Sequence, residues 1–215
     1  MFEGNATLML PADAPSPSRT RIDPRAIRPS QAYRLLTASI VPRPIAWVST
    51  RSVEGTHNLA PYSFFTVASS EPPILQITSI GHKDTWRNIV DTGQFVVNIG
   101  TETLIDQMNT TSAPFDSSVD EFEAAGLTPI DSEVVAAPQV AEAPIAFECE
   151  KQLILEVGNG TIILGLVVGI SMSNDVLADD GLPDFGRLAP PSRLGRTEWG
   201  LAPQTTIRDR PRATG

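Results

Sequence analysis

The turn Gly158-Asn159-Gly160 separates two long runs of mostly apolar residues, 145–157 and 161–172. An Asn-Gly pair between two alternating apolar runs is a strong hairpin signal, because both residues tolerate the positive φ angles that tight hairpin turns need. We therefore expect the last third of the chain to supply two antiparallel strands.

Other segments carry strand signals, and helices are expected between them. Stretches rich in β-branched and aromatic residues predict strands at 41–50, 59–68, 74–79 and 94–100. Helices are expected at 30–38, capped by Ser30, from an Asp84 cap to near Gly93, at 101–109 and at 119–125. Strands, a helical insert and strands again predict a mainly β fold, a closed antiparallel barrel with peripheral helices.

The domain organisation follows from where these signals begin and end. Residues 29–201 are expected to form one domain, because no repeat or low-complexity block divides them. Residues 1–28 are rich in proline and polar residues, which favours a flexible N-terminal arm, and the alternative is an arm that wraps a partner subunit. Residues 202–215 carry no core pattern and are expected to form a C-terminal tail.

Composition excludes several classes of protein. The net charge of −9 argues against a nucleic-acid partner, because such binding depends on neutralising phosphates with Lys and Arg. No apolar run approaches the roughly 18 residues of a membrane span, and the N-terminus lacks a secretory signal. The single cysteine, Cys149, favours a reducing, cytoplasmic location. The only histidines, His57 and His82, are expected to be solvated and outside catalysis, and no metal site is expected.

The best candidates for chemistry lie in two cationic segments, 42–50 and 83–88. Lys83 and Thr85 surround a helix start and offer a cation, a hydroxyl and free backbone N–H groups, and Ser79 adds a second hydroxyl. The alternative is an ordinary capped surface helix. Arg43, between two prolines at the start of a strand, could bind a phosphate, lie beside an electron-rich ring or form a structural salt bridge.

The hairpin expected from the strands 41–50 and 59–68 suits a planar phosphorylated ligand, and flavin mononucleotide (FMN) is the obvious candidate. The backbone of residues 45–50 could face the polar edge of the ring, with Ser49 and Thr50 adding side-chain bonds. Trp47 is expected in the core. Period-two alternation requires at least one of Phe64 and Phe65 to be core as well. Neither a G-x-S-x-G nor a G-x-G-x-x-G motif is present, which argues against a hydrolase triad and a Rossmann site.

Several ordered motifs together resemble the flavin reductase-like, FMN-binding split-barrel proteins. They are Pro-Arg-Pro-Ile-Ala-Trp-Val-Ser-Thr from Pro42, Asn-Leu-Ala-Pro-Tyr-Ser-Phe-Phe from Asn58, Lys-Asp-Thr-Trp-Arg-Asn from Lys83, Glu-Phe-Glu-Ala-Ala-Gly-Leu-Thr from Glu121 and Arg-Leu-Gly from Arg193. The resemblance is greatest to the flavoredoxin-like branch and to reductase components of two-component monooxygenases. It implies a split β-barrel homodimer that binds FMN near the subunit interface.

The resemblance also implies a set of cofactor-binding residues. Lys83, Thr85 and Ser79 would hold the phosphate, and Arg193 and Trp199 would close the pocket from a late loop or from the other subunit. The full set is Arg43, Pro44, Ile45, Ala46, Ser49, Thr50, Asn58, Ala60, Ser63, Ser79, Lys83, Thr85, Arg193 and Trp199.

Two departures from the family pattern bear on the electron donor. Many relatives that use NADH or NADPH have Gly-Asp-His where this chain has Gly158-Asn159-Gly160, and a later histidine where it has Ser171. Both departures argue against hydride transfer from NADH or NADPH and leave the FMN site untouched. The expected function is an FMN-dependent oxidoreductase of the flavin reductase type, with NADH or NADPH as a candidate donor and a partner monooxygenase as a candidate acceptor. The alternative is a non-catalytic FMN carrier of electrons or flavin, and a barrel that has lost flavin is disfavoured. No general acid or base is assigned, because hydride transfer to a flavin requires none.

Overall fold

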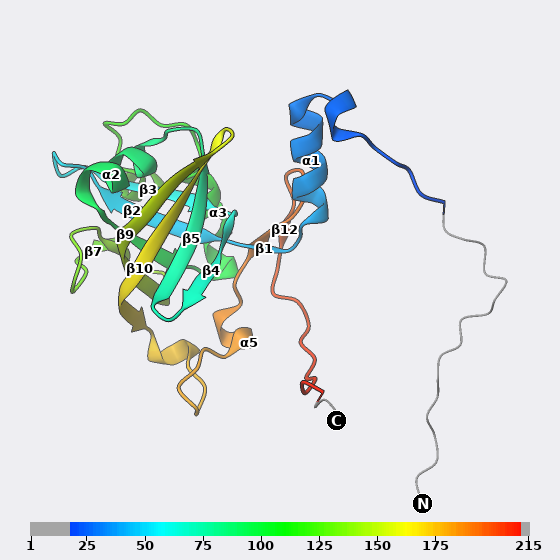
Figure 1. Ribbon diagram of the computed structural model, residues 1–215. Coiled ribbons are helices and arrows are strands. Elements are labelled where there is room, and N and C mark those ends of the chain that lie inside the picture. The colour runs from blue at the N-terminus through cyan, green and yellow to red at the C-terminus, as the bar shows by residue number, and fades with distance from the viewer. Residues whose placement is uncertain (1–17, 212–215) are drawn as a thin grey trace, which may run out of the picture.

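The computed structural model describes residues 18–211, which fold around a seven-stranded antiparallel sheet with strand order β3-β2-β6-β9-β10-β5-β4 (Figure 1). The strands are β2 (Ala46–Arg51), β3 (His57–Tyr62), β4 (Phe65–Ser70), β5 (Pro73–Ile80), β6 (Gln94–Ile99), β9 (Ile145–Val157) and β10 (Gly160–Met172). Strand β3, at one end of this order, also contacts β5 near the other end, so the sheet curls into a barrel. The predicted mainly β barrel is confirmed.

The hairpin of β9 and β10 forms as its turn predicts. The two strands pair from Gly160 opposite Val157 to Met172 opposite Ile145, and Gly158 takes a φ of 61° in the turn. The pairing shifts register between Leu164 and Gly165, where the ring of Phe95 occupies the space that a Cβ would need. Glycine at this position therefore lets the aromatic ring pack directly on the strand.

Strand β2 separates two apolar clusters, because its alternate side chains point to opposite faces. Val48 packs inside the barrel with residues such as Phe95 and Ile163. Trp47 packs on the other face with Leu59 and Phe122, beneath helices α3 (Ile105–Thr110) and α4 (Glu121–Ala125). Trp47 is fully buried, as predicted, and its indole N–H donates to Thr111 Oγ1 at 2.9 Å.

The helices form close to their predicted ranges, but two caps differ. Helix α1 (Pro29–Ser39) begins after Arg28 rather than Ser30, with Pro29 in the first turn, where its fixed φ suits a helix. The N-cap of α2 (Asp84–Thr92) is Lys83 rather than Asp84. Gly93 ends α2 with a φ of 73°, as expected of a C-terminal glycine.

A second, three-stranded sheet joins segments far apart in the chain. Strand β1 (Arg43–Pro44) pairs with β11 (Ser192–Arg193), which pairs with β12 (Trp199–Gly200). The predicted strand 41–50 is thus divided into β1 and β2, and the predicted strand 59–68 into β3 and β4. Figure 1 shows α1 and this small sheet standing off the barrel.

The remaining elements are short and lie mostly on the surface. They are η1 (Pro24–Ala26), η2 (Glu102–Leu104), η3 (Asn174–Val176), α5 (Phe185–Leu188), β7 (Pro129–Ile130) and β8 (Gln139–Val140). Of the expected N-terminal arm, residues 18–28 are almost wholly exposed and the rest lies outside the described residues. Of the expected tail, residues 202–211 have no regular secondary structure, and the last four residues are likewise not described.

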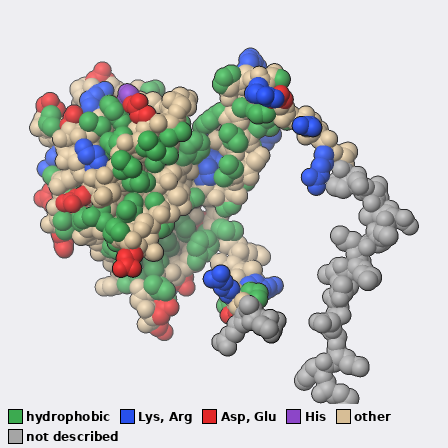
Figure 2. Space-filling view, in the orientation of Figure 1, with side chains coloured by type: hydrophobic (Ala, Val, Ile, Leu, Met, Phe, Trp, Pro, Cys, Tyr) green, Lys and Arg blue, Asp and Glu red, His purple; other side chains and the backbone are tan. Residues whose placement is uncertain are grey.

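Apolar side chains extend over part of the surface. They cover the visible face of the strands and much of α1 (Figure 2). Leu36 of α1 and Ile40 at its C-terminal end are 59% and 63% exposed, and Leu155 of β9 is 50% exposed. Within residues 18–211, no helix is long and apolar enough to cross a membrane.

Candidate functional site

A groove runs along strand β3 between the start of α2 and the end of α3. Alternation along β3 puts Asn58, Ala60 and Tyr62 on one face of the strand. These residues line a cavity of about 310 Å³ together with Lys83 and Thr85. The hairpin and the helix start that the sequence singled out are therefore brought together.

The α2 end of the groove is suited to an anion. The first backbone N–H groups of a helix have no intrahelical acceptors. In α2 the N-cap side chain does not supply one either. Lys83 is exposed, and among residues 18–211 it forms no ion pair, whereas Asp84 is paired with Arg87 at 2.6 Å. An uncapped helix start beside an unpaired lysine favours phosphate oxygens.

Tyr62 adds a hydroxyl donor to the same cavity as Lys83 and Thr85. Its hydroxyl is buried and has no hydrogen-bond partner among the described residues. Burial raises the pKa of the Tyr62 phenol, and the neighbouring hydroxyls of Thr85 and Ser79 offset part of that rise. The phenol therefore keeps its proton and remains a potential donor.

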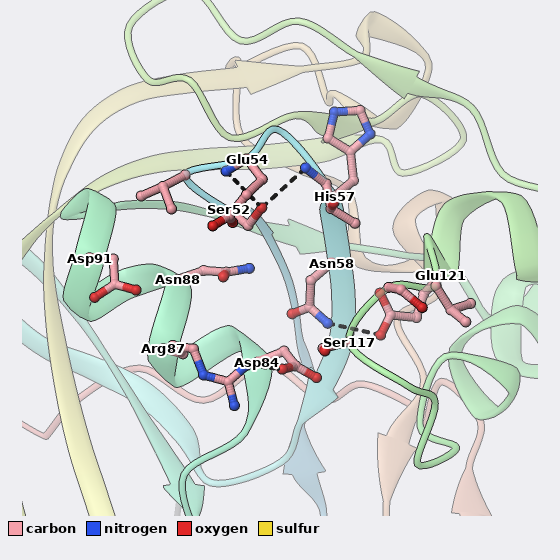
Figure 3. Close-up of a pocket in the computed structure, with 14 residues that line it drawn as sticks. Ser52, Glu54, His57, Asn58, Asp84, Arg87, Asn88, Asp91, Ser117 and Glu121 are labelled. Carbon is pink, nitrogen blue, oxygen red and sulfur yellow. Dashed lines mark hydrogen bonds and ion pairs between the residues drawn. The ribbon is translucent and has the colours of Figure 1, made fainter.

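A buried hydrogen-bond network fixes the wall of the groove (Figure 3). Glu121 Oε1 accepts from Asn58 Nδ2 at 2.9 Å, and its Oε2 accepts from the backbone N–H of Leu59 at 3.1 Å. Asn58 Oδ1 in turn accepts from Thr85 Oγ1 at 2.6 Å. Burial raises the pKa of Glu121, while its bonds to Leu59 and Asn58 oppose that rise. The network ties α4, β3 and α2 together.

The other end of the groove is smaller. A cavity of about 120 Å³ shares Pro61 and Ser112 with the first and is lined by Ile45, Ser63, Asn109, Arg193 and Trp199. The Arg193 guanidinium carbon lies 4.8 Å from the centroid of the Trp199 ring. The sheet of β1, β11 and β12 brings Arg193 and Trp199 beside Arg43, just before the hairpin of β2 and β3, within one chain. Ile45, Pro61 and Trp199 beside a cation and three polar side chains suit a planar heterocycle with a polar edge.

Arg43 lies behind the smaller cavity, and its guanidinium donates hydrogen bonds to other protein atoms. It is 8% exposed and donates to the carbonyls of Thr37, Ile40 and Leu194, the latter two at 2.9 Å, and to Ser63 Oγ at 3.3 Å. No carboxylate among the described residues pairs with it. Burial lowers the pKa of Arg43 without removing its charge. The Arg43 guanidinium thus joins α1, β1 and the residue after β11 without a salt bridge among the described residues, and its role beside a cofactor stays a prediction.

Other predicted site residues also lie outside the groove. Ser49 and Thr50 point to opposite faces of β2, so both cannot meet one ligand edge. Ser49 is fully buried and donates to the Pro138 carbonyl at 2.5 Å, and the Thr50 hydroxyl donates to Asn58 Oδ1. Ala46 and Ser79 are fully buried, and Pro44 is exposed and lines a separate apolar cavity.

The predicted residues that line the groove are Ile45, Asn58, Ala60, Ser63, Lys83, Thr85, Arg193 and Trp199. Sequence reasoning missed Tyr62, Ser112 and Glu121. Tyr62 could have been found from Asn58 by period two, whereas Glu121 carried no signal beyond its place in a family motif. His57 is half-buried, contrary to the prediction, and lies 3.3 Å from Asp120, whereas His82 is exposed, as predicted, and its ring stacks on Trp86 with centroids 3.9 Å apart.

Two further features complete the surroundings. A polar cavity of about 410 Å³ lies on the other side of Asn58 and Glu121, between α2 and the turn before β3 (Figure 3). Within residues 18–211, no three His, Cys, Asp or Glu side chains are grouped so as to hold a metal ion.

Comparisons with known proteins bear on the fold and on the class of protein. A sequence profile described as a flavin reductase like domain matches residues 38–188. The structure of nitrilotriacetate monooxygenase component B from Bacillus cereus is 32% identical, has a TM-score of 0.86 and covers 90% of this chain and 100% of its own. That of 2-nitrobenzoate 2-nitroreductase from Pseudomonas fluorescens is 31% identical, with a TM-score of 0.81, over 89% of this chain and 96% of its own.

A third structure supports the fold alone. A split barrel domain protein from Shewanella frigidimarina is 20% identical, with a TM-score of 0.78, over 88% of this chain and 96% of its own. The barrel described above is therefore a split barrel, as predicted. The first two matches, together with the profile, indicate a flavin-related oxidoreductase.

Proposed function

Because this chain belongs to the flavin reductase-like family, we propose that it binds FMN in the groove along β3 and transfers reducing equivalents through it. One observation carries the proposal: an uncapped helix start with an unpaired lysine lies at one end of a groove whose other end is lined by Ile45, Trp199 and Arg193. A phosphorylated planar cofactor needs those two environments at its two ends.

The chain's own residues would bind and orient the cofactor. Lys83 and the first-turn N–H groups of α2 would hold the phosphate, and Thr85 would be fixed beside them by Asn58. Ala60 and Pro61 would lie along the middle, and Trp199 with Ile45 would exclude water from the ring. The flavin supplies the electron-transfer chemistry itself, and the protein supplies orientation, electrostatics and access.

The electron donor in this proposal is NADH or NADPH, and the acceptor is a small molecule or a separate monooxygenase that uses reduced flavin. The second candidate is an FMN carrier that is reduced by another protein. A specific observation favours it: the turn Gly158-Asn159-Gly160 lies beside the α2 loop, with Gly81 N–H donating to the Asn159 carbonyl at 3.1 Å, and this turn offers no histidine.

A spectroscopic titration separates these functions. Purified protein is mixed with FMN, its visible spectrum is recorded, and NADH or NADPH is added without oxygen. A bound flavin that bleaches at a catalytic rate supports the reductase. One that bleaches only with dithionite supports the carrier, and a protein that binds no FMN refutes both.

Lys83→Ala tests the phosphate end. Loss of one charged hydrogen bond should weaken FMN binding by about 1.5–3 kcal/mol, roughly tenfold or more, while riboflavin, which lacks the phosphate, should bind unchanged. Arg34→Ala is the matched control, because Arg34 is an exposed cation on α1 away from the groove. Equal FMN affinity in both variants would remove Lys83 from the site.

We also propose that two copies of the chain associate through the exposed apolar surface of α1 and β9, which includes Leu36, Leu153 and Leu155. Sedimentation analysis tests this proposal. The wild type is expected as a dimer, and Leu36→Glu or Leu155→Glu is expected to raise the monomer fraction, because each buries a charge in an apolar contact. A monomeric wild type would refute the dimer.

A further inference from the structure

Glu121 is a buried carboxylate whose position the proposed cofactor contacts do not explain. It is 6% exposed and lines the groove, yet it begins α4 on a different part of the chain from β3 and α2. Phe122, 1% exposed in the outer core, packs α4 against Trp47 and Leu59, and its N–H donates to the N-cap Asp120 Oδ1 at 2.8 Å, which fixes the first turn of the helix. This anchoring directs the carboxylate toward Asn58.

Glu121 decides which way the Asn58 amide faces. Both carboxylate oxygens accept protein donors, Asn58 Nδ2 and the Leu59 N–H. Because an ionised carboxylate can only accept, the NH₂ group of Asn58 must point to Glu121 and its oxygen must point away. That oxygen receives the Thr85 hydroxyl at 2.6 Å, and Thr85 is in the uncapped first turn of α2.

We propose that Glu121 is a positioning residue for the anion end of the groove: through the Asn58 amide it holds Thr85, and with it the first turn of α2, where a phosphate can be bound. This inference rests on the proposed FMN site and names a residue that acts on it without touching the ligand phosphate. Without the carboxylate, the amide can rotate and present NH₂ to Thr85, and the position of the first turn is no longer fixed.

Glu121→Gln is the direct test, because it keeps the size of the side chain while replacing one acceptor with a donor. Glu123→Gln is the matched control, since Glu123 is exposed on the same short helix and removing it changes net charge equally. Dissociation constants for FMN and for riboflavin are measured for the wild type and both variants. Glu121→Gln should weaken FMN on the order of tenfold and leave riboflavin within about twofold, and Glu123→Gln should change neither.

Two further measurements distinguish positioning from a general loss of stability. In the Asn58→Ala background, Glu121→Gln should cause no additional loss of FMN affinity, because the effect passes through that amide. In the ligand-free protein, amide exchange of Arg87 and Asn88 in α2 should quicken in Glu121→Gln, while exchange of β9 should not. This readout needs no flavin and keeps the test valid if Glu121→Gln binds poorly for other reasons.

The outcomes are separable. If the wild type prefers FMN to riboflavin and Glu121→Gln keeps the same preference, the positioning role is overturned while the proposed function stands. An additive loss in the Asn58→Ala background also overturns it. If the wild type binds neither flavin, both the proposed function and this inference fail.

Discussion

Replacing Arg43 tests whether this residue holds the fold together or binds the cofactor. Arg43→Met keeps the aliphatic stem and removes the guanidinium, which donates to three backbone carbonyls and to Ser63. Arg196→Met is the control, because the Arg196 side chain lies in the turn between β11 and β12, is 73% exposed and has only a 3.6 Å contact with Glu198.

The size of the stability loss in Arg43→Met depends on which of the three carbonyls water can reach once the guanidinium is removed. A hydrogen bond to a charged donor contributes about 1.5–3 kcal/mol, and a buried acceptor left unsatisfied costs about 1–3 kcal/mol. The carbonyl of Ile40 can bond to water, since that residue is 63% exposed, whereas Thr37 is buried and Leu194 is half-buried. Two carbonyls thus account for most of the effect, and we expect a loss of about 2–4 kcal/mol in the free energy of unfolding.

Thermal unfolding followed by circular dichroism measures this loss. For a chain of this size the melting temperature should fall by roughly 5–15 °C in Arg43→Met and by less than about 2 °C in Arg196→Met. The ratio of FMN to riboflavin affinity should not change, because the guanidinium is already occupied. A variant as stable as the control would refute the structural role. A selective loss of FMN over riboflavin would show that Arg43 reaches the phosphate after all.

Three further predictions concern the core and the buried acid. Burial raises the pKa of the Cys149 thiol to about 12, so a thiol reagent such as DTNB should leave the native protein unlabelled near neutral pH and modify one thiol per chain after unfolding; rapid native labelling would contradict this. Gly165→Ala would drive its Cβ into the Phe95 ring, and chemical denaturation should show a loss of about 1–3 kcal/mol; an unchanged midpoint would argue against that packing. Because burial raises the folded-state pKa of Glu121 above its usual 4.5, its stabilising contribution is full below that pH and is lost as pH rises through the folded value. The melting temperature of the wild type minus that of Glu121→Gln should therefore fall as pH rises from about 4.5 toward neutrality, and a flat or rising difference would refute this sign.

The parts of the fold that the sequence predicts are those with local signals. The hairpin of β9 and β10 shows period-two alternation around an Asn-Gly turn, and Gly93 marks the end of α2. The small sheet carries no such signal, because strands of two residues have no periodicity and β1 pairs with residues about 150 positions away, Arg43 opposite Arg193. Only tertiary packing brings these segments together.

The site divides in the same way. Asn58, Ala60, Lys83 and Thr85 line one cavity, and each could be singled out from the sequence because a strand face and a helix start are local features. Ser49 and Thr50 are adjacent in β2, so alternation along the strand places their side chains on opposite faces.

Two side chains depend on contacts that no local pattern encodes. The acceptors of Arg43 include the carbonyl of Leu194, 151 residues away, and the partner of Glu121 is Asn58, 63 residues away. Both side chains are charged and almost fully buried, a combination that hydrophobicity and propensity do not predict.

The two ends of the groove are therefore held by different parts of the molecule. The α2 end is fixed within the barrel by buried contacts among β3, α2 and α4, centred on Asn58 and Glu121. The Trp199 end depends on the small sheet, which Arg43 joins to α1, and α1 exposes apolar side chains to solvent. A change in what covers α1 would alter the walls around the planar part of a ligand before it alters the phosphate end. If FMN binds as proposed, contacts within the barrel would hold its phosphate, and the walls around its ring would depend on what packs on α1.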